Sequence, residues 1–357
     1  MALSVITDAQ ADALLTGLVQ HYSPSMSEGP AVSYLVEEMT KLGFQAEIDD
    51  AGNAVGIAGD GDRTILLLGH IDTVPGFIEV ERHGDLLYGR GTVDAKGPLA
   101  TFVVAAARVL NSHRDCLGDK RIVVVGAVEE EAATSKGARF VLDRLTPEAV
   151  VIGEPSRWNR LTVGYKGRLL VDYVLRRDIG HTARPDAGVC DEAHSFWAGV
   201  RSYTATYNEG KRRMFEQLSP SLRTMHSESD GFVEVATLTL GFRLPPEIDI
   251  DELQSRLIGM AGDAHLTFRG REQAYHASKS TPLARSFIKA IDAEGGRVQF
   301  KVKSGTSDMN VVGPVWDCPI LAYGPGDSSL DHTPEEHIDL REYHSAIAVL
   351  TRALADL

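Results

Sequence analysis

The sequence predicts an α/β protein, with a mixed sheet flanked by helices, that is interrupted by an inserted α+β domain. Two continuous apolar runs, at 65–68 and 122–125, are separated by a helical pattern over 98–110, as in a βαβ unit. From about residue 165 the pattern changes to longer strands in which polar and apolar residues alternate. We therefore expect a discontinuous catalytic domain, residues 1–164 and 276–357, and a lid and dimerisation domain, residues 165–275.

Apolar patterns and glycine positions delimit the elements of the expected catalytic domain. A helix over 28–42 ends at Gly43, since glycine readily adopts the left-handed conformation that closes a helix. The strands are continuous apolar runs, which is typical of strands covered on both faces. They are expected at 63–69, 121–127 and 150–152. Beyond the insertion, the pattern predicts a helix over 281–293, a loop at 304–308, a strand over 319–323 and a final helix from 341.

The inserted domain differs from the rest of the chain in pattern and in charge. Its expected elements are strands over 168–176, 231–242 and 265–269 and helices over 191–208 and 250–260. Between residues 165 and 275 the chain has 14 Lys and Arg against 16 Asp and Glu, a net charge of −2. The remaining −12 of the total charge of −14 lies on the expected catalytic domain.

Composition excludes several classes of protein. At about 150 residues per domain, 357 residues predict two domains. The net charge of −14 argues against nucleic-acid binding, which needs a basic surface. The longest apolar run, 99–110, contains Arg108 and is shorter than the roughly 20 residues of a membrane span. No Lys or Arg occurs in the first ten residues, so we expect no secretory signal and a cytoplasmic protein. Three scattered cysteines, without a CxxC spacing, are assigned no role.

Polar side chains follow the predicted strands at their carboxyl ends, where α/β sheets place their ligand sites. His70 and Asp72 follow the first buried strand, and residues i and i+2 of an extended segment share a face. The carboxylate can therefore orient the imidazole towards a metal, although a polar pair that caps the strand is equally consistent. Asp94 lies in a glycine-rich turn without a phosphate-binding signature, and alone it fits a turn former or helix N-cap.

Three further positions add acids and a second histidine. Residues 129–131 are consecutive glutamates after the next strand; such a run usually forms a solvated loop, but a cation would remove its repulsion. Glu154 follows the third strand, and His332 lies near the C-terminus. Together these residues form a nitrogen and oxygen ligand set suited to zinc. We expect His70 and Glu154 on one ion, Glu131 and His332 on a second, and Asp94 as the bridge, because three carboxylates and one hydroxide balance two divalent cations.

The order of these motifs resembles a known family. The segments HxDxVP, GxxDxKG, Glu-Glu, GEP and a C-terminal histidine are similar to those of the co-catalytic zinc amidohydrolases, which include acetylornithine deacetylase, succinyl-diaminopimelate desuccinylase and glutamate carboxypeptidase. The resemblance implies two divalent ions, zinc or alternatively cobalt, and Asp72 as the residue that orients His70. It identifies Glu130 as the general base, and it implies a cis peptide bond at Asp94-Ala95.

The resemblance also assigns residues outside the metal site. It implies that His181 of the lid stabilises the oxyanion in the partner subunit's site, so that the protein is a homodimer through its lid domain. Arg243 resembles the family arginine that binds a substrate carboxylate, although relatives often have Asn or Asp where this chain has Gly241. A lid ion pair is the alternative role for Arg243. Gly305 and Thr306 lie in a segment similar to the family's Gly-Thr-Ser-Asp substrate loop.

Three segments, 23–25, 93–99 and 304–310, most resemble the branch that hydrolyses lysine or ornithine conjugates of a small acidic amino-group carrier protein in lysine and arginine biosynthesis. Such a carrier is expected to dock on the lid, where 176–177 and 211–213 are basic. The alternatives are a deacylase of free N-acetyl-lysine or N-acetylornithine, or a related metallo-carboxypeptidase. An alternative of a different class is a catalytically inactive binding protein of the same fold.

Overall fold

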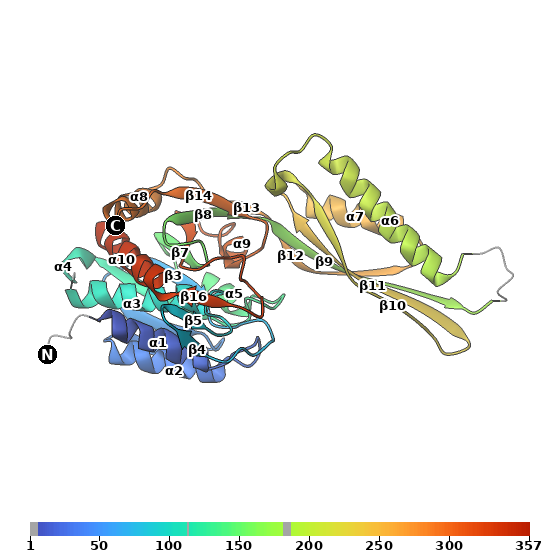
Figure 1. The fold of residues 1–357 in the computed structure, drawn as a ribbon. Helices are drawn as coiled ribbons and strands as arrows, with labels where there is room; N and C mark the ends of the chain where they lie inside the picture. The colour runs from blue at the N-terminus through green and yellow to red at the C-terminus, as the bar shows by residue number, and fades with distance from the viewer. Residues whose placement is uncertain (1–5, 113, 181–186) are drawn as a thin grey trace. The chain divides into compact units, whose positions relative to one another are not determined.

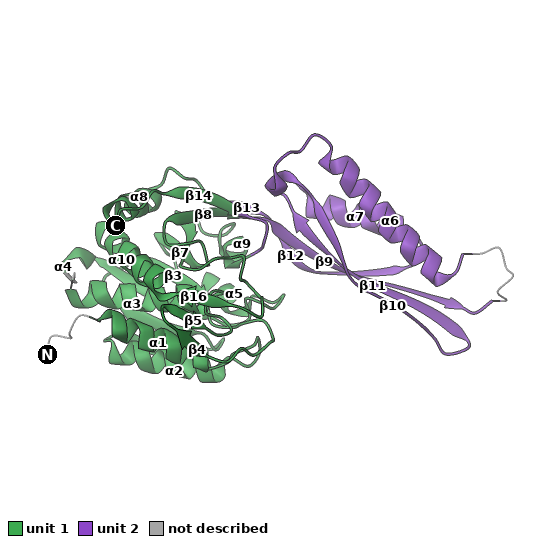
Figure 2. Cartoon of the chain, in the orientation of Figure 1, with its two compact units in different colours: residues 1–164, 277–302, 307–357 green, residues 165–276, 303–306 purple. Residues whose placement is uncertain are grey.

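The computed structural model describes residues 6–112, 114–180 and 187–357, which form two compact units (Figures 1 and 2). The first unit comprises residues 1–164, 277–302 and 307–357, and the second comprises 165–276 and 303–306. The expected division placed 303–306 in the catalytic domain. In the structure this segment packs with the second unit, where the guanidinium of Arg243 donates a hydrogen bond to the hydroxyl of Thr306.

A mixed sheet forms the centre of the first unit, with the strand order β1-β2-β6-β3-β7-β15-β8 and with β14 also paired to β8. The inner strands β6, β3, β7 and β15 are parallel, whereas β1, β2 and β8 join their neighbours antiparallel. The strands are β1 (Gln45–Ile48), β2 (Ala54–Ala58), β3 (Arg63–His70), β6 (Lys120–Ala127), β7 (Ala149–Gly153), β8 (Arg160–Tyr165), β14 (Gln299–Lys303) and β15 (Ile320–Tyr323).

The apolar runs become inner strands because both faces of the sheet are covered. In β3, Ile65 and Leu67 belong to the main core, and Leu66 and Leu68, which point to the opposite face, are also fully buried. The helices of this unit are α1 (Asp8–Gln20), α2 (Gly29–Lys41), α3 (Lys96–Ser112), α4 (Arg114–Leu117), α5 (Lys136–Leu142), α8 (Pro282–Ala293), α9 (Asp308–Val312) and α10 (Leu340–Asp356). Helices α1, α3, α8 and α10 (Figure 1) contribute to the main core, and α5 contacts β6.

A small antiparallel sheet has the strand order β16-β5-β4, and its strand β5 precedes the segment that carries Asp94 in the sequence. Its strands are β4 (Glu81–His83), β5 (Leu86–Tyr88) and β16 (His337–Asp339). The pairing of β5 with β16 brings the turn after Tyr88 next to the loop that precedes His337. These two segments contain Asp94 and His332, so the small sheet helps to position two of the expected metal ligands.

The second unit is an antiparallel sheet, in the order β10-β11-β9-β12, with α6 and α7 on one face (Figure 2). Alternate residues of β9, such as Leu169, Val171 and Tyr173, pack against the helices in a separate core. The elements are β9 (Gly167–Asp178), α6 (Val189–Asn208), η1 (Met214–Glu216), β10 (Ser219–Ser229), β11 (Val233–Leu244), α7 (Ile250–Ala261), β12 (His265–Glu272) and β13 (Tyr275–His276).

No helix among the described residues has both the length and the apolar character required to cross a membrane.

Candidate metal centre

His70 is the last residue of β3 and is almost fully buried. Its Nδ1 lies 3.0 Å from the main-chain oxygen of Asp72, and a carbonyl oxygen can only accept, so Nδ1 carries the proton. The other ring nitrogen, Nε2, is thereby left as the one that can bind a metal, and it lies 3.2 Å from Oδ1 of Asp94. The ring is therefore held in the tautomer that a metal ligand requires.

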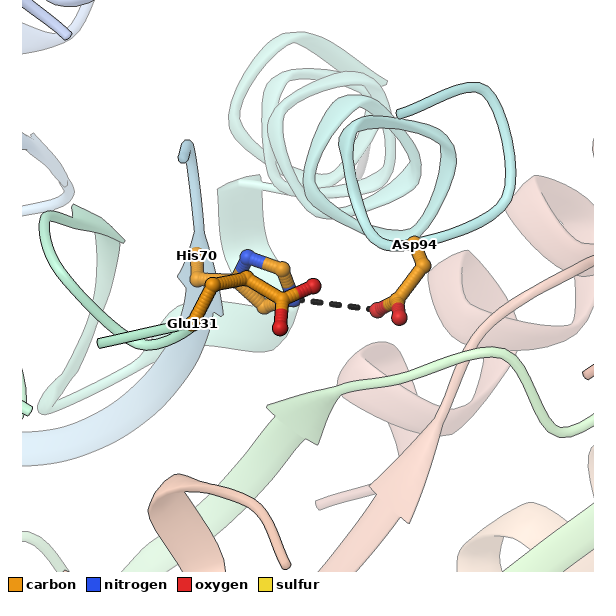
Figure 3. Close-up of side chains that lie close together, drawn as sticks. All are labelled: His70, Asp94 and Glu131. Carbon is orange, nitrogen blue, oxygen red and sulfur yellow. Dashed lines mark hydrogen bonds and ion pairs between the residues drawn. The ribbon is translucent and has the colours of Figure 1, made fainter. Parts of the chain in front are cut away.

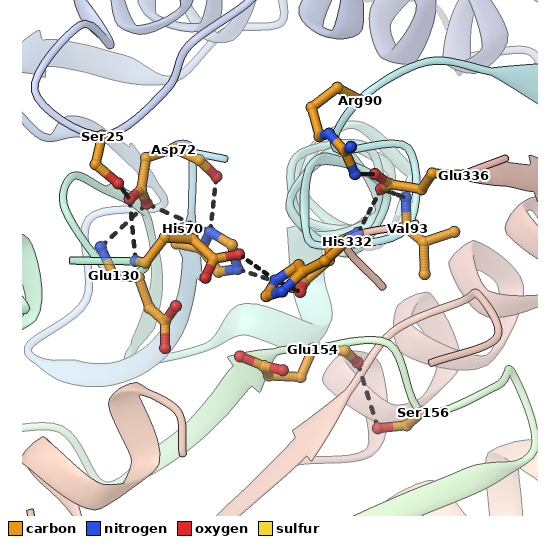
Figure 4. Close-up of polar contacts among 12 residues, drawn as sticks. Ser25, His70, Asp72, Arg90, Val93, Glu130, Glu154, Ser156, His332 and Glu336 are labelled. Carbon is orange, nitrogen blue, oxygen red and sulfur yellow. Dashed lines mark hydrogen bonds and ion pairs between the residues drawn. The ribbon is translucent and has the colours of Figure 1, made fainter. Parts of the chain in front are cut away.

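The carboxylate of Asp72 connects two strand ends. It is fully buried, its Oδ1 lies 3.4 Å from Nδ1 of His70, and it accepts a 2.7 Å hydrogen bond from the hydroxyl of Ser25. It also accepts 3.0 Å hydrogen bonds from the main-chain N–H groups of Glu130 and Glu131 (Figure 4). Asp72 thus contacts the imidazole and also fixes the acidic loop after β6, a second contact that the sequence pattern did not indicate.

The consecutive glutamates separate because the strand has ended. Glu129 has a positive φ of 60°, and its carboxylate accepts a 2.7 Å hydrogen bond from the hydroxyl of Thr134. Oε1 of Glu131 lies 2.8 Å from Nε2 of His332. The chain reversal therefore directs the carboxylates of Glu129 and Glu131 to different partners.

Asp94 lies between the two histidines. One of its oxygens, Oδ1, faces Nε2 of His70, and the other, Oδ2, lies 3.0 Å from Nε2 of His332. Ligand atoms of His70, Asp94 and Glu131 all lie within 4.8 Å of one another (Figure 3). The peptide bond between Asp94 and Ala95 is cis, which confirms the prediction for this turn.

Glu336, which the sequence analysis did not single out, holds the main chain of this turn. It is fully buried, and its Oε1 accepts hydrogen bonds from the N–H groups of Val93 at 2.9 Å and Asp94 at 3.1 Å. Its Oε2 lies 2.8 Å from the buried guanidinium of Arg90 (Figure 4), and this guanidinium also donates to the main-chain oxygen of Gly76. Its position four residues after His332 is the only sequence signal for this role.

The acids in this region share a crowded, buried space, as their pKa values show. Burial raises the pKa of Glu130 well above its usual range, against the opposing effect of His70, and nearby Asp308 and Glu154 raise it further. Burial and the charge of Asp94 likewise raise the pKa of Glu131. Glu154 is itself buried at the end of β7.

The histidines compensate part of this negative charge by binding protons. Hydrogen bonds to Asp94 and Glu131 raise the pKa of His332 to about 10. Burial lowers the pKa of His70, but hydrogen bonds with Asp72 and Asp94 outweigh it and raise the value well above normal. The pKa of Asp94 is lowered, because the same bonds outweigh its burial. A set of imidazoles and buried carboxylates that needs positive charge fits divalent cations such as zinc.

The expected substrate residues lie in the second unit. Arg243 is half-buried in β11, and Thr306 accepts its hydrogen bond. Gly305 adjoins Thr306, and an added Cβ there would contact nothing within 4 Å. His181 lies outside the described residues.

Comparison with known proteins places this geometry in a family. Residues 66–356 match the model of peptidase family M20/M25/M40. The chain is 44% identical to the [LysW]-lysine hydrolase of Deinococcus radiodurans, over 94% of both chains. It is 28% identical to the [LysW]-lysine/[LysW]-ornithine hydrolase of Saccharolobus islandicus, over 98% of this chain and 96% of that one.

Solved structures share the fold at low identity. An M20 metallo-carboxypeptidase from Sulfolobus solfataricus aligns with a TM-score of 0.77 and 19% identity, covering 97% of this chain and 98% of its own. A dinuclear metal-binding M20 peptidase from Bacillus subtilis aligns with a TM-score of 0.70 and 11% identity, covering 98% and 97%. The family match and the curated relatives show that this chain belongs to peptidase family M20/M25/M40.

Proposed function

We propose that this protein is a two-metal amide hydrolase that releases lysine, or ornithine, from its conjugate with a small acidic amino-group carrier protein. The relatives from Deinococcus radiodurans and Saccharolobus islandicus support this substrate, because both are named for LysW conjugates and match nearly the whole chain. The observation that carries the chemistry is the position of Asp94, which directs one carboxylate oxygen to each of two histidines.

This arrangement assigns the ligands of two divalent ions, zinc or cobalt. His70 and Glu154 would hold one ion, Glu131 and His332 the other, and Asp94 would contact both. When bound, such ions polarise an amide carbonyl and make a water molecule more acidic. Asp72 holds the ring of His70 so that Nε2 faces Asp94, and Glu336 fixes the main chain of Asp94.

Glu130 is the proposed general base. Burial raises its pKa, and a raised pKa makes a carboxylate a stronger base towards the attacking water. Glu130 would take a proton from the attacking water and deliver it to the leaving amine. Asp72 positions Glu130 through its main-chain N–H, at 3.0 Å.

Residues of the second unit complete the proposal. Arg243, supported by Thr306, would bind the α-carboxylate of the amino acid to be released, since a guanidinium pairs with a carboxylate through two parallel hydrogen bonds. Gly305 would allow the substrate to approach the main chain closely. His181 would stabilise the oxyanion across a homodimer formed by this unit, in a cytoplasmic enzyme.

A direct assay tests the proposal. The metal-loaded protein is incubated with a carrier–lysine conjugate, a carrier–ornithine conjugate and free N-acetyl-lysine, and the released amino acid is quantified. The proposal predicts efficient hydrolysis of a carrier conjugate. Hydrolysis of N-acetyl-lysine alone would instead identify a deacylase, and no hydrolysis by protein with bound metal would identify an inactive binding protein.

A further inference from the structure

One face of the sheet in the second unit packs against α6 and α7, and the opposite face is called the open face here. The open face carries an arginine that the proposed mechanism does not use. Core residues of β9 and β11 alternate with residues that point away from α6 and α7, and Gly241 and Arg243 belong to this second set. Arg223 lies on the neighbouring strand β10, where the pairing with β11 shifts between Leu222 and Thr224. The irregular register leaves Arg223 without a residue directly opposite.

The side chain of Arg223 lies across Gly241. A Cβ added to Gly241 would come within 2.7 Å of Nε and 3.1 Å of Cζ of Arg223, and within 3.0 Å of Oγ of Ser221. Gly241 is buried although it lies on the open face, because the guanidinium covers it. The lack of a side chain at Gly241 therefore makes room for the arginine.

No acidic residue of the described chain neutralises the positive charge of Arg223. Within the described part of the chain, no carboxylate lies within ion-pair distance of the exposed Arg223. Two cations of the basic segments 176–177 and 211–213 do have acidic partners: Lys211 lies 3.5 Å from Glu247, and Arg177 lies 2.5 Å from Glu192. The basic segments expected to dock a carrier are thus partly neutralised, whereas Arg223 is available to an anion.

Arg223 lies over Gly241, and Arg243 is the next residue of β11 on the same face. Residues 241 and 243 point to the same face and are about 7 Å apart along the strand. Two guanidinium groups at such a spacing repel each other and favour a ligand with two anionic groups. Since the proposed function gives the α-carboxylate of the amino acid to Arg243, Arg223 remains for a carboxylate on the acyl side of the amide.

We infer that Arg223 and Gly241 form a second carboxylate subsite, so that this enzyme prefers amides whose acyl group carries a free carboxylate. The inference rests on the proposed function, since it places the amino-acid carboxylate at Arg243. It adds that the acyl group is recognised by its charge and not only by its length.

Two matched compounds test the subsite: Nα-glutaryl-lysine, which has an acyl carboxylate, and Nα-pentanoyl-lysine, which has the same chain length without one. Binding is measured by calorimetry to metal-loaded Glu130→Gln protein, in which hydrolysis of both amides is expected to be about 10²–10⁴-fold slower. The glutaryl compound should bind at least tenfold more tightly. In the same background, Arg223→Gln should bring its affinity down to that of the pentanoyl compound. Gly241→Ala should reduce the preference by displacing the guanidinium.

Arg201→Gln is the matched control, because Arg201 is an exposed arginine of the same unit on α6, on the helical face. The preference should survive this substitution. Equal affinity for the two compounds in the parent protein, or a preference that persists in Arg223→Gln, would overturn the inference. The carrier-conjugate assay of the wild-type protein is separate, so failure of the proposed function is recognised independently.

Discussion

Glu129 and Glu130 are neighbours in the sequence, yet their surroundings predict very different effects of substitution on kcat. Glu130 is the buried acid with the raised pKa, and the main-chain N–H of this residue is held by Asp72. We expect Glu130→Gln to lower kcat by about 10²–10⁴-fold, the usual contribution of a general base. The bound metal should be retained, because Glu130 is not one of the proposed ligands. Steady-state kinetics together with metal analysis by mass spectrometry check both expectations.

Glu129→Gln is the matched control for this prediction. The Glu129 carboxylate contacts Thr134 and lies 3.8 Å from Nζ of Lys136. The amide of glutamine can still accept the hydrogen bond of Thr134, so kcat should change less than threefold. If the two variants lost activity equally, the proposed division of roles within the acidic run would be wrong.

His332 makes metal binding dependent on pH. Its pKa of about 10 in the metal-free protein means that the imidazole is protonated at neutral pH, and a metal must displace that proton. Affinity should therefore rise by at least about tenfold per pH unit, since the proton on His332 and the one on His70, whose pKa is also raised, must both be displaced. Competition against a chelating dye between pH 6.5 and 8.5 measures the slope. An affinity independent of pH over this range would show that His332 is not a ligand.

Much of this centre could be predicted from residue types and spacing. His70, Asp94 and Glu131 do converge, because each follows a strand or turn at the same edge of the sheet. The role of Glu336 could not be predicted, because the sequence does not distinguish this buried glutamate, which binds main-chain N–H groups, from the exposed Glu335 beside it. Only the pairing of β5 with β16 brings Glu336 to Asp94.

Among the helices and strands, those with the strongest apolar pattern were predicted best from the sequence. The inner strands β3, β6 and β7 and the helix α3 were expected because burial on all sides leaves long apolar runs. Strand β10 was not expected: it is an edge strand whose residues are mostly exposed, so its sequence has no alternation. It is the strand that carries Arg223.

The turn that carries Asp94 depends on the ion pair of Glu336 and Arg90. Replacing Glu336 by alanine leaves a buried guanidinium and two main-chain N–H groups without their acceptor. We expect Glu336→Ala to reduce the free energy of unfolding by about 3–5 kcal/mol. In protein that remains folded, we expect metal affinity to fall by about 10–100-fold. Calorimetric unfolding and zinc titration measure the two effects.

Glu335→Ala serves as the comparison for the turn. Glu335 is exposed and directly precedes Glu336, so its loss should change stability by about 0.5 kcal/mol or less. If Glu336→Ala destabilised the protein but left metal affinity at the value of Glu335→Ala, Glu336 would serve the fold and not the position of Asp94.

On the scale of the whole molecule, the two units have separate apolar cores, and the proposed functional residues are divided unequally between them. All the proposed metal ligands lie in the first unit, together with Asp72, Glu130 and Glu336. The second unit has its own apolar cluster, built from β9, β11, α6 and α7. The excess negative charge of the chain also lies outside the insertion. Bound cations should therefore stabilise the first unit in particular.

Chelation of the metal tests this distribution, because a ligand stabilises only the structure that binds it. Removing the ions with a chelator should increase hydrogen exchange in β3, in β6 and in the turn that contains Asp94. Exchange in β9 and β11 should change little, since their core includes no proposed ligand. Hydrogen exchange followed by mass spectrometry resolves these segments, and a washed, metal-reloaded sample controls for the chelator itself. An equal rise of exchange in both units would mean that the metals stabilise the chain as one cooperative structure, and the assignment of their effect to the first unit would then be wrong.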